Sequence, residues 1–201
     1  MKRFALIAAL VTICMGAMAQ EKLYEVKSGI VTMEMDMMGQ AMVQEIYFDD
    51  YGAKQVTVSN FGGGKMRMLN QDGGQIMVND AEKTATKMPM MMGPQERVNF
   101  CNLTEKEIKK YKVQELGKET VAGKECTKYS VTLMAMGQPQ KQTVWVYKGI
   151  TLKSQSNSDF GAMNQVATKV QENVEIDPAM FTIPAGVKVE EMNMGMMGGG
   201  W

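Results

Sequence analysis

Methionines are the residues of this sequence whose type and spacing could do chemistry. They gather over residues 33–42, 88–92 and 192–197, and the pattern M-x-M-x-M-M begins at Met33 and again at Met192. A thioether sulfur is a soft ligand that prefers Cu(I) or Ag(I). The sequence therefore offers candidate soft-metal ligands in two of these groups: Met33, Met35, Met37, Met192, Met194 and Met196.

The same methionines have two simpler interpretations. Val31, Met33, Met35 and Met37 alternate with polar residues, so they share one face of a strand, as ordinary apolar residues do. Methionine is flexible and polarizable, which suits a core or an adaptable binding surface. Twenty of the 23 methionines remain after the first 19 residues (23 − 3 = 20), so a compositional bias is the other interpretation. All three interpretations stay open at this point.

Other catalytic chemistry has little support in the sequence. The chain has no histidine, which excludes Ser-His-Asp and Cys-His arrangements and every imidazole metal site. The carboxylate pairs Asp49-Asp50 and Glu190-Glu191 are adjacent, and neighbours on a strand point to opposite faces. The glycine-rich segments F-G-G-G-K and Q-D-G-G lack the spacing of a phosphate-binding loop. We therefore predict a protein that is not an enzyme and needs no cofactor.

The beginning of the chain predicts export. Residues 1–19 have a basic start, an apolar stretch and an A-x-A cleavage site, as in a secretory signal peptide. Cleavage leaves 20 basic residues (22 − 2) against 22 acidic ones and no segment able to cross a membrane. No basic run favours nucleic acid. We expect a periplasmic or secreted protein, peripheral to the envelope if it associates with it, with one domain over residues 20–189 and a disordered Met/Gly-rich tail over residues 190–201.

The predicted state of the cysteines depends on that compartment. Cys101 and Cys126 are the two that remain after cleavage, and an even number in an oxidising compartment indicates one disulfide. Two free buried thiols are the alternative, and a redox or metal role is a further one. The chain has no C-x-x-C motif of the thioredoxin type.

Most of the mature chain has the period-two pattern of half-buried strands, with turn signals every 8–12 residues. Gly39-Gln40 ends the first strand and makes it one arm of a hairpin. Thr104 and Glu107 form a capping-box pattern that predicts a helix of about two turns. Asp177-Pro178 predicts a further short helical turn. These signals describe an antiparallel meander with one or two short helices.

Two runs are specific enough to suggest a family. They are V-W-V-Y-K-G-I-T-L-K over residues 144–153 and D-P-A-M-F-T-I-P-A-G over residues 177–186. With the signal peptide and the meander, they resemble the exported half-barrel domains of the lipoprotein-carrier (LolA/LolB-like) superfamily, over residues 22–189. The resemblance implies a mainly β (α+β) fold, in which a strongly curved antiparallel sheet forms an incomplete barrel with one or two short helices over its open side.

The predicted function combines the resemblance with the apolar strand faces. In the lipoprotein carriers the concave sheet surface holds acyl chains, so we expect a non-enzymatic protein that binds a lipid or other apolar small molecule. The candidate cavity residues are Val31, Met33, Met35, Met37, Trp145 and Tyr147. The alternatives are a Cu(I)- or Ag(I)-binding envelope protein and an envelope sensor or scaffold that binds another protein.

Overall fold

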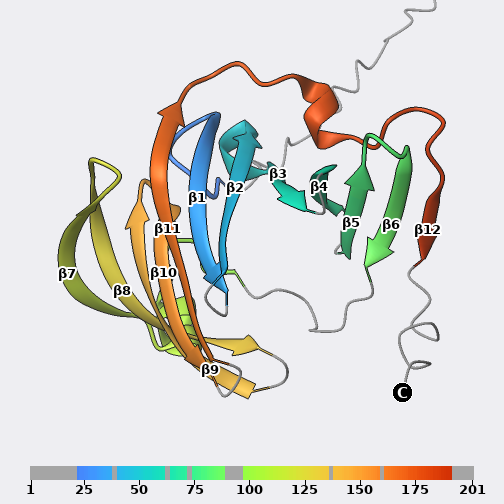
Figure 1. Cartoon of the computed structure of the whole chain (residues 1–201). Helices are drawn as coiled ribbons and strands as arrows, with labels where there is room; N and C mark the ends of the chain where they lie inside the picture. The colour runs from blue at the N-terminus through green and yellow to red at the C-terminus, as the bar shows by residue number, and fades with distance from the viewer. Residues whose placement is uncertain are drawn as a thin grey trace, which may run out of the picture.

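One sheet contains all the strands of the described chain. The computed structural model describes residues 22–37, 40–61, 64–71, 74–88, 97–135, 138–158 and 161–191. In this part of the chain, twelve strands lie in the order β12-β6-β5-β4-β3-β2-β1-β11-β10-β9-β8-β7 (Figure 1). The strands are β1 (Gly29–Met37), β2 (Gln40–Asp49), β3 (Lys54–Phe61), β4 (Gly64–Gln71), β5 (Gly74–Asn79), β6 (Thr84–Met88), β7 (Gln114–Val121), β8 (Lys124–Ala135), β9 (Gln138–Tyr147), β10 (Ile150–Ser158), β11 (Gly161–Glu172) and β12 (Val189–Glu191).

Two antiparallel meanders build this sheet. Strands β1 to β6 pair in chain order, and so do β7 to β11. The last strand of the second meander, β11, pairs antiparallel with β1 and joins the two meanders. The chain then crosses back to the far edge, where β12 pairs parallel with β6 (Figure 1). The predicted hairpin is the β1–β2 pair, in which Gly29 lies opposite Phe48 and Met37 opposite Gln40.

The sheet is open, with β7 and β12 at its edges. The predicted mainly β, antiparallel architecture is confirmed, but the predicted strong curvature into an incomplete barrel is wrong, because the sheet is neither closed nor strongly curled (Figure 1). Curling into a barrel requires a consistent tilt and stagger of the strands. In this sheet the edge strands β7 and β12 each pair with one neighbour, so the ordinary strand twist is not converted into closure.

The described residues contain one α-helix, α1 (Glu105–Tyr111), and two 3₁₀ turns, η1 (Asp50–Gly52) and η2 (Pro178–Phe181). The predicted capping box is present: Glu107 N–H donates to Thr104 Oγ1 (3.3 Å), and Thr104 N–H donates to Glu107 Oε2 (3.0 Å). Helix α1 contacts β8, whereas the resemblance implied a helix across an open barrel. No helix in the described residues is long and apolar enough to cross a membrane.

The predicted disulfide between Cys101 and Cys126 is wrong, because both are free thiols. The two cysteines lie on different elements, and each thiol has its own backbone partner. The Cys101 thiol faces the carbonyl oxygen of Lys148 at 3.6 Å, and the buried Cys126 thiol of β8 donates to that of Lys124 at 3.5 Å. Burial raises the pKa of both thiols, which favours their protonated forms.

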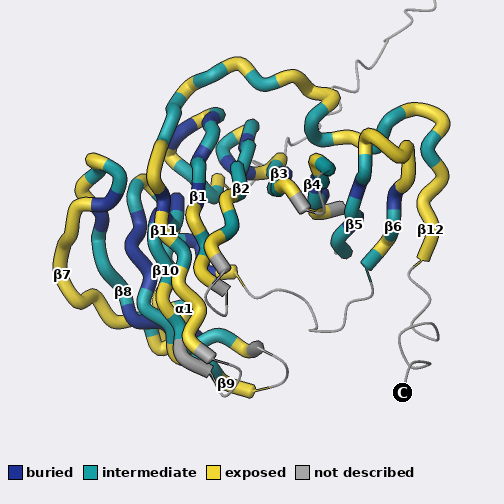
Figure 2. The backbone as a smooth tube through the Cα atoms, viewed as in Figure 1, coloured by how far each residue is buried: buried dark blue, intermediate teal, exposed yellow. Residues whose placement is uncertain are grey.

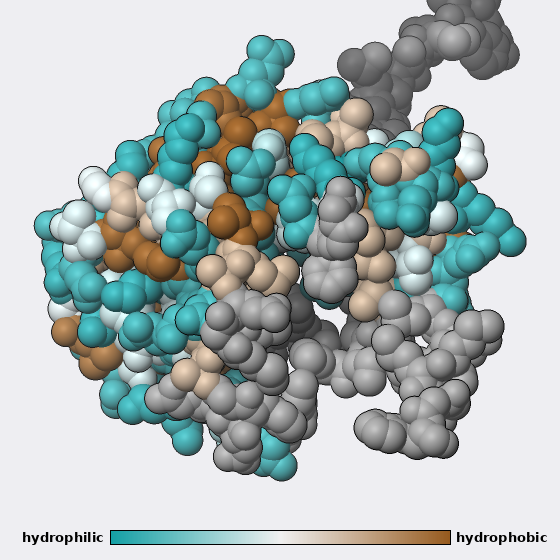
Figure 3. All heavy atoms as spheres, viewed as in Figure 1, coloured by the Kyte–Doolittle hydropathy of each residue, from teal (hydrophilic) through white to brown (hydrophobic). Residues whose placement is uncertain are grey.

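Buried side chains form three clusters, which lie within the two meanders and at their junction. The largest includes Phe48, Trp145 and Leu152. The second joins β3 to β6 with Phe181 and Ile183 of the returning segment. By contrast, β7 is exposed until its last residue (Figure 2). On the face seen in Figure 3, apolar side chains form separate patches among polar ones.

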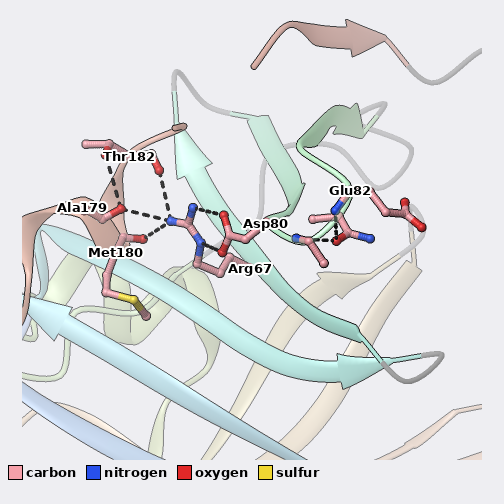
Figure 4. Close-up of polar contacts among 8 residues, drawn as sticks. Arg67, Asp80, Glu82, Ala179, Met180 and Thr182 are labelled. Atoms are coloured by element: carbon pink, nitrogen blue, oxygen red, sulfur yellow. Dashed lines mark hydrogen bonds and ion pairs between the residues drawn. The ribbon is translucent and has the colours of Figure 1, made fainter. Parts of the chain in front are cut away.

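The returning segment is attached to the sheet through Arg67 of β4 (Figure 4). The Arg67 guanidinium, in a residue only 4% exposed, forms an ion pair with Asp80 and donates through Nη1 to the carbonyl oxygens of Ala179, Met180 and Thr182. Ala179 and Met180 belong to η2, and Thr182 directly follows it. The contact holds η2 against one sheet face and leaves the other face of β3 to β6 for the candidate site.

Candidate functional site

The odd-numbered residues of β1 begin the candidate site. Val31 and Met33 are buried, and Met35 is half-buried. Residues directly opposite each other in an antiparallel pair share a sheet face, and Met35 lies opposite Met42 of β2. The shared methionine face predicted from alternation therefore continues onto the second strand. Met37 is the last residue of β1, and its side chain lies outside the described part of the structure.

The strand register extends this face across the first meander. Ile46, opposite Val31, also lies opposite Thr57 of β3, and Thr57 lies opposite Met68 of β4. Met68 in turn lies opposite Met77 of β5. We call the methionines on this side of the first meander the methionine face: Met33, Met35, Met42, Met66, Met68, Met77 and Met88.

A cavity of about 370 Å³ opens beside the methionine face. Its volume lies within the range of small-molecule sites, which is roughly 300–1,000 Å³. Met33 and Met68 contribute to its lining, and so does Ile150 at the start of β10. Its apolar wall includes Leu23, Val31, Met33, Ile46, Phe48 and Phe100. Its polar groups are mainly neutral amides and hydroxyls, among them Gln55, Thr57, Asn70, Gln75, Thr151 and Gln165.

Two segments outside the sheet complete the cavity wall. In the N-terminal one, the backbone N–H groups of Leu23 and Tyr24 both donate to the carbonyl oxygen of Tyr51, at 3.0 Å. The second precedes α1, and the side chain of its buried Asn99 donates through Nδ2 to the carbonyl oxygen of Lys22, at 3.1 Å. This hydrogen bond ties the two segments together, so Leu23 and Phe100 are fixed against the sheet residues of the cavity.

Three polar lining residues, Tyr24, Gln55 and Arg97, interact with one another. Arg97 Nη2 donates to Gln55 Oε1 at 3.2 Å, and Gln55 Nε2 donates to the carbonyl oxygen of Gly52 at 2.7 Å. Burial raises the pKa of the Tyr24 hydroxyl, although Arg97 and a hydrogen bond with Gln55 oppose the rise. The Tyr24 ring packs edge-to-face on Phe48, with 4.9 Å between ring centres. Polar donors therefore lie directly beside the apolar wall.

Of the predicted cavity residues, the structure brings Val31 and Met33 into the lining. Trp145 lies elsewhere. Met35 is opposite Gln165 of β11, Gln165 is opposite Ser154 of β10, and Ser154 is opposite Val144 of β9. Val144 therefore shares the face of Met35, and the next residue, Trp145, points to the opposite face.

The environments of Trp145 and Tyr147 are those of structural side chains. Trp145 Nε1 donates to Glu119 at 2.7 Å, and the ammonium groups of Lys128 and Lys153 lie 4.7 and 4.2 Å from the centre of its ring system. The Tyr147 hydroxyl donates to Glu172 at 3.1 Å. Neither residue is among those that line the cavity.

The metal candidates are divided between described and undescribed parts of the chain. Met33 and Met35 share the methionine face, whereas Met192, Met194 and Met196 lie outside the described residues. Two pairs of methionines lie directly opposite each other on neighbouring strands, Met35 with Met42 and Met68 with Met77. Within the described residues, no group of His, Cys, Asp and Glu side chains could hold a metal ion.

Several cavity residues could not be recognised in the sequence. Arg97, Tyr24 and Phe100 belong to non-strand segments with no local motif, and they reach the cavity only through long-range contacts. Gln55 and Phe48 lie on strands with the expected alternation, but a register was needed to place them opposite each other. Alternation indicated which residues share a face, and strand pairing determined which face borders the cavity.

Solved structures share the fold. An uncharacterized conserved protein from Thermus thermophilus matches with a TM-score of 0.54 and 7% identity, over 84% of this chain and 92% of that one. MucB matches with a TM-score of 0.53 and 14% identity, over 84% of this chain and 62% of MucB. In the complex of Pseudomonas aeruginosa MucA and MucB, the TM-score is 0.50 and the identity 15%, over 79% of this chain and 56% of that one. This chain therefore spans about three fifths of the MucB chains that it matches.

These matches show that the chain shares its fold with MucB and with the Thermus protein. At these identities they identify no ligand for this chain. No curated protein has a sequence that matches the chain. The family described as a domain of unknown function, DUF4412, matches residues 28–186, and this protein belongs to that family.

Proposed function

We propose that this protein is an exported, non-enzymatic binding protein that holds a lipid or other apolar ligand in the cavity beside the methionine face. The observation that carries the proposal is the cavity of about 370 Å³ with an apolar wall made by Val31, Met33, Ile46 and Phe48. Burial of apolar ligand surface against such a wall contributes roughly 25 cal/mol per Å².

The methionine face suits ligands of variable shape. Apart from the buried Met33, its methionines are half-buried, so their thioether groups remain partly open to a ligand. Unbranched methionine side chains repack at low cost around different apolar shapes. An acyl chain that fills the cavity can therefore continue along Met68 towards the neighbouring strand without a fixed end point.

Displacement of a fluorescent fatty-acid probe from delipidated protein tests the proposal. Met68 and Met77 lie opposite each other and are both half-buried, but only Met68 lines the cavity. Met68→Glu places a charge in the cavity, so we expect probe affinity to fall by about tenfold or more. Met77→Glu is the matched control and should change affinity by less than about threefold. Thermal unfolding of each variant shows whether it is folded.

Two results would contradict the proposal. One is a wild-type protein that neither binds the probe nor yields lipid when purified from its source and extracted with organic solvent. The other is an equal loss of affinity in the Met68→Glu and Met77→Glu variants, because binding would then not be centred on the cavity.

A soft-metal function is the second candidate, favoured by the two opposed methionine pairs. Side chains directly opposite each other have Cβ atoms about 4.5–5.5 Å apart, so both sulfurs of a pair can reach one ion. Titration with Cu(I) against a competing chelator tests this function. If Met35 and Met42 bind the ion, replacing both by leucine removes the two sulfur ligands at nearly unchanged side-chain volume. Equal Cu(I) affinity of the wild type and this double variant would exclude the pair as ligands. Deletion of residues 192–201 tests the other methionine cluster separately.

A further inference from the structure

The cavity contains one charged group among the described residues of its lining, and it is a cation. The other described lining residues are apolar, amide, hydroxyl or glycine, and Arg97 is the exception. We propose that the ligand of this cavity carries a single anionic head group and that Arg97 binds that head group. This inference rests on the proposed function and specifies its ligand class as an amphipathic anion.

The hydrogen bonding of Arg97 leaves it free to bind an anion. Its one hydrogen bond within the described residues goes to the neutral Gln55 side chain, and none of the described carboxylates pairs with it. A guanidinium has five N–H donors, so most of them remain available. The comparison with Arg67 is informative, since its guanidinium is occupied by Asp80 and three backbone carbonyls. Arg67 is a structural cation, whereas Arg97 is a binding cation.

The groups around Arg97 are placed and protonated so that an anionic head group can bind there. Arg97 is exposed, so a bound head group at the cavity mouth keeps part of its hydration. The Tyr24 hydroxyl, whose pKa is raised by burial, remains a neutral donor at the same end of the cavity. Gln55 is fixed by its bond to Gly52 and holds the Arg97 guanidinium in place. These groups provide directed hydrogen bonds for a small oxyanion.

The apolar wall starts directly behind this polar group. Tyr24 packs on Phe48, and Phe48, Met33 and Ile46 continue the lining away from Arg97. A ligand with an acyl chain and an anionic end can therefore bind Arg97 with its anionic end while its chain contacts the apolar wall. A cationic amphiphile would bring a like charge to Arg97 and lose the hydrogen bonds. Carboxylates and phosphates both match the planar guanidinium, so the head group belongs to one of these classes.

A set of ligands with one chain length and different ends tests the inference on delipidated full-length mature protein. Lauric acid, dodecyl phosphate, dodecanol and dodecylamine are titrated by calorimetry at low ionic strength. We expect the two anions to bind at least about tenfold more tightly than dodecanol, and dodecylamine to bind most weakly. A preference between lauric acid and dodecyl phosphate distinguishes a fatty-acid ligand from a phospholipid-type ligand. Added salt should weaken anion binding and leave dodecanol binding nearly unchanged.

Variants separate the head-group inference from the proposed function. Arg97→Gln should lower affinity for lauric acid by about tenfold while dodecanol binding stays within about twofold, and Arg97→Lys should restore part of the difference. Lys106→Gln, on the exposed surface of α1, is the charge-matched control and should change neither. Equal binding of dodecanol and lauric acid by the wild type would overturn the inference and leave the proposed function standing. Failure of all four ligands to bind would overturn both.

Discussion

Arg67 of β4 and Asp80, in the turn after β5, form a two-pronged ion pair. Arg67 Nε donates to Asp80 Oδ2 at 2.7 Å and Nη2 donates to Oδ1 at 2.6 Å (Figure 4). This geometry orients the guanidinium so that Nη1 points to the carbonyl oxygens of Ala179, Met180 and Thr182. The pair also holds the pKa of the Asp80 carboxyl below its usual range, chiefly through the Arg67 hydrogen bond. It therefore remains charged and keeps the contact intact at neutral pH.

Replacing Arg67 should destabilise the fold. Arg67→Met leaves three carbonyl oxygens without this donor and Asp80 without its partner, so we expect a loss of about 2–4 kcal/mol in the free energy of unfolding. Lys54→Met removes the same charge from an exposed position on the neighbouring strand β3 and should cost less than about 0.5 kcal/mol. Urea unfolding measures both. Similar losses in the two variants would show that the contact with η2 contributes little.

The contact shows what sequence patterns can and cannot reveal. Asp177-Pro178 predicted a helical turn, and η2 begins there, because an N-terminal cap and a proline act over a few residues. The alternation of β4 could not identify Arg67 as a buried residue with partners 112 to 115 positions away in the chain. An arginine on a strand is usually a solvent-exposed residue, and only the return of the chain after β11 buries this one.

Glu172 predicts a dependence of stability on pH. Hydrogen bonds from Lys124, Lys148 and the Tyr147 hydroxyl lower the pKa of its carboxyl from 4.5 to about 2. Because the folded-state pKa is below the unfolded one, the carboxylate stabilises the fold above about pH 4.5, and this contribution is lost as pH falls from 4.5 towards 2. The lysines are partly exposed, so solvent screening reduces the contribution to about 1–2 kcal/mol.

The Glu172→Gln variant measures that contribution. At pH 7 it should be less stable than the wild type by about 1–2 kcal/mol, and the difference should shrink as pH falls towards 2, where the Glu172 carboxyl begins to be protonated in the folded state as well. Glu175→Gln, at an exposed position without an ion-pair partner in the described chain, is the control. Unfolding midpoints in urea across this pH range give the comparison. A difference between wild type and Glu172→Gln that is constant with pH would show that charge is not the cause.

Gly149 is predicted to be less replaceable than Gly123. Both follow a residue with positive φ in a hairpin turn, and both have positive φ themselves, 82° for Gly149 and 73° for Gly123. A Cβ on Gly149 would collide with the carbonyl oxygen of Leu23 and the thiol of Cys101, whereas a Cβ on Gly123 would meet no atom within 4 Å.

Alanine at these two positions separates backbone strain from close packing. Gly123→Ala should cost about 1 kcal/mol for the left-handed conformation alone. Gly149→Ala should cost at least about 2 kcal/mol more, because Leu23 and the cavity wall that it helps to form must move. Thermal unfolding gives the stabilities, and probe binding should be weaker for Gly149→Ala only. Equal stability of the two variants would show that the cavity wall adapts freely.

Alternation along single strands predicted part of the candidate site, and strand pairing, which the sequence does not reveal, decided the rest. Val31 and Met33 share a face by alternation, and they line the cavity. Trp145 belongs to the same alternating pattern, but the pairing of β9 with β10 and of β11 with β1 places Val144, and not Trp145, on that face. One extra residue in β11, between Ala167 and Lys169, and one in β10, between Thr151 and Lys153, shift the strand register, and a single strand's sequence does not reveal these shifts.

The free cysteines give the last prediction. A disulfide that closed the chain between Cys101 and Cys126 would contribute about 3–4 kcal/mol, which corresponds to several degrees in unfolding temperature. Because both thiols are free, the unfolding temperature of the oxidised, purified protein should not change when reductant is added. Thiol titration in denaturant without reductant should detect both Cys101 and Cys126. A fall of several degrees with reductant would show that the thiols pair in solution.

Substitutions distinguish the roles of the two thiols. Cys126 is fully buried in the largest apolar cluster, so Cys126→Ala should cost about 1–2 kcal/mol through lost packing. Cys101 is only half-buried, so Cys101→Ala should cost less. The loss in the free energy of unfolding of the double variant should equal the sum of the losses of the two single variants, because the effects of independent sites are additive. A double variant that is clearly more stable than this sum would indicate an interaction between the thiols, and a disulfide would then be the simplest explanation.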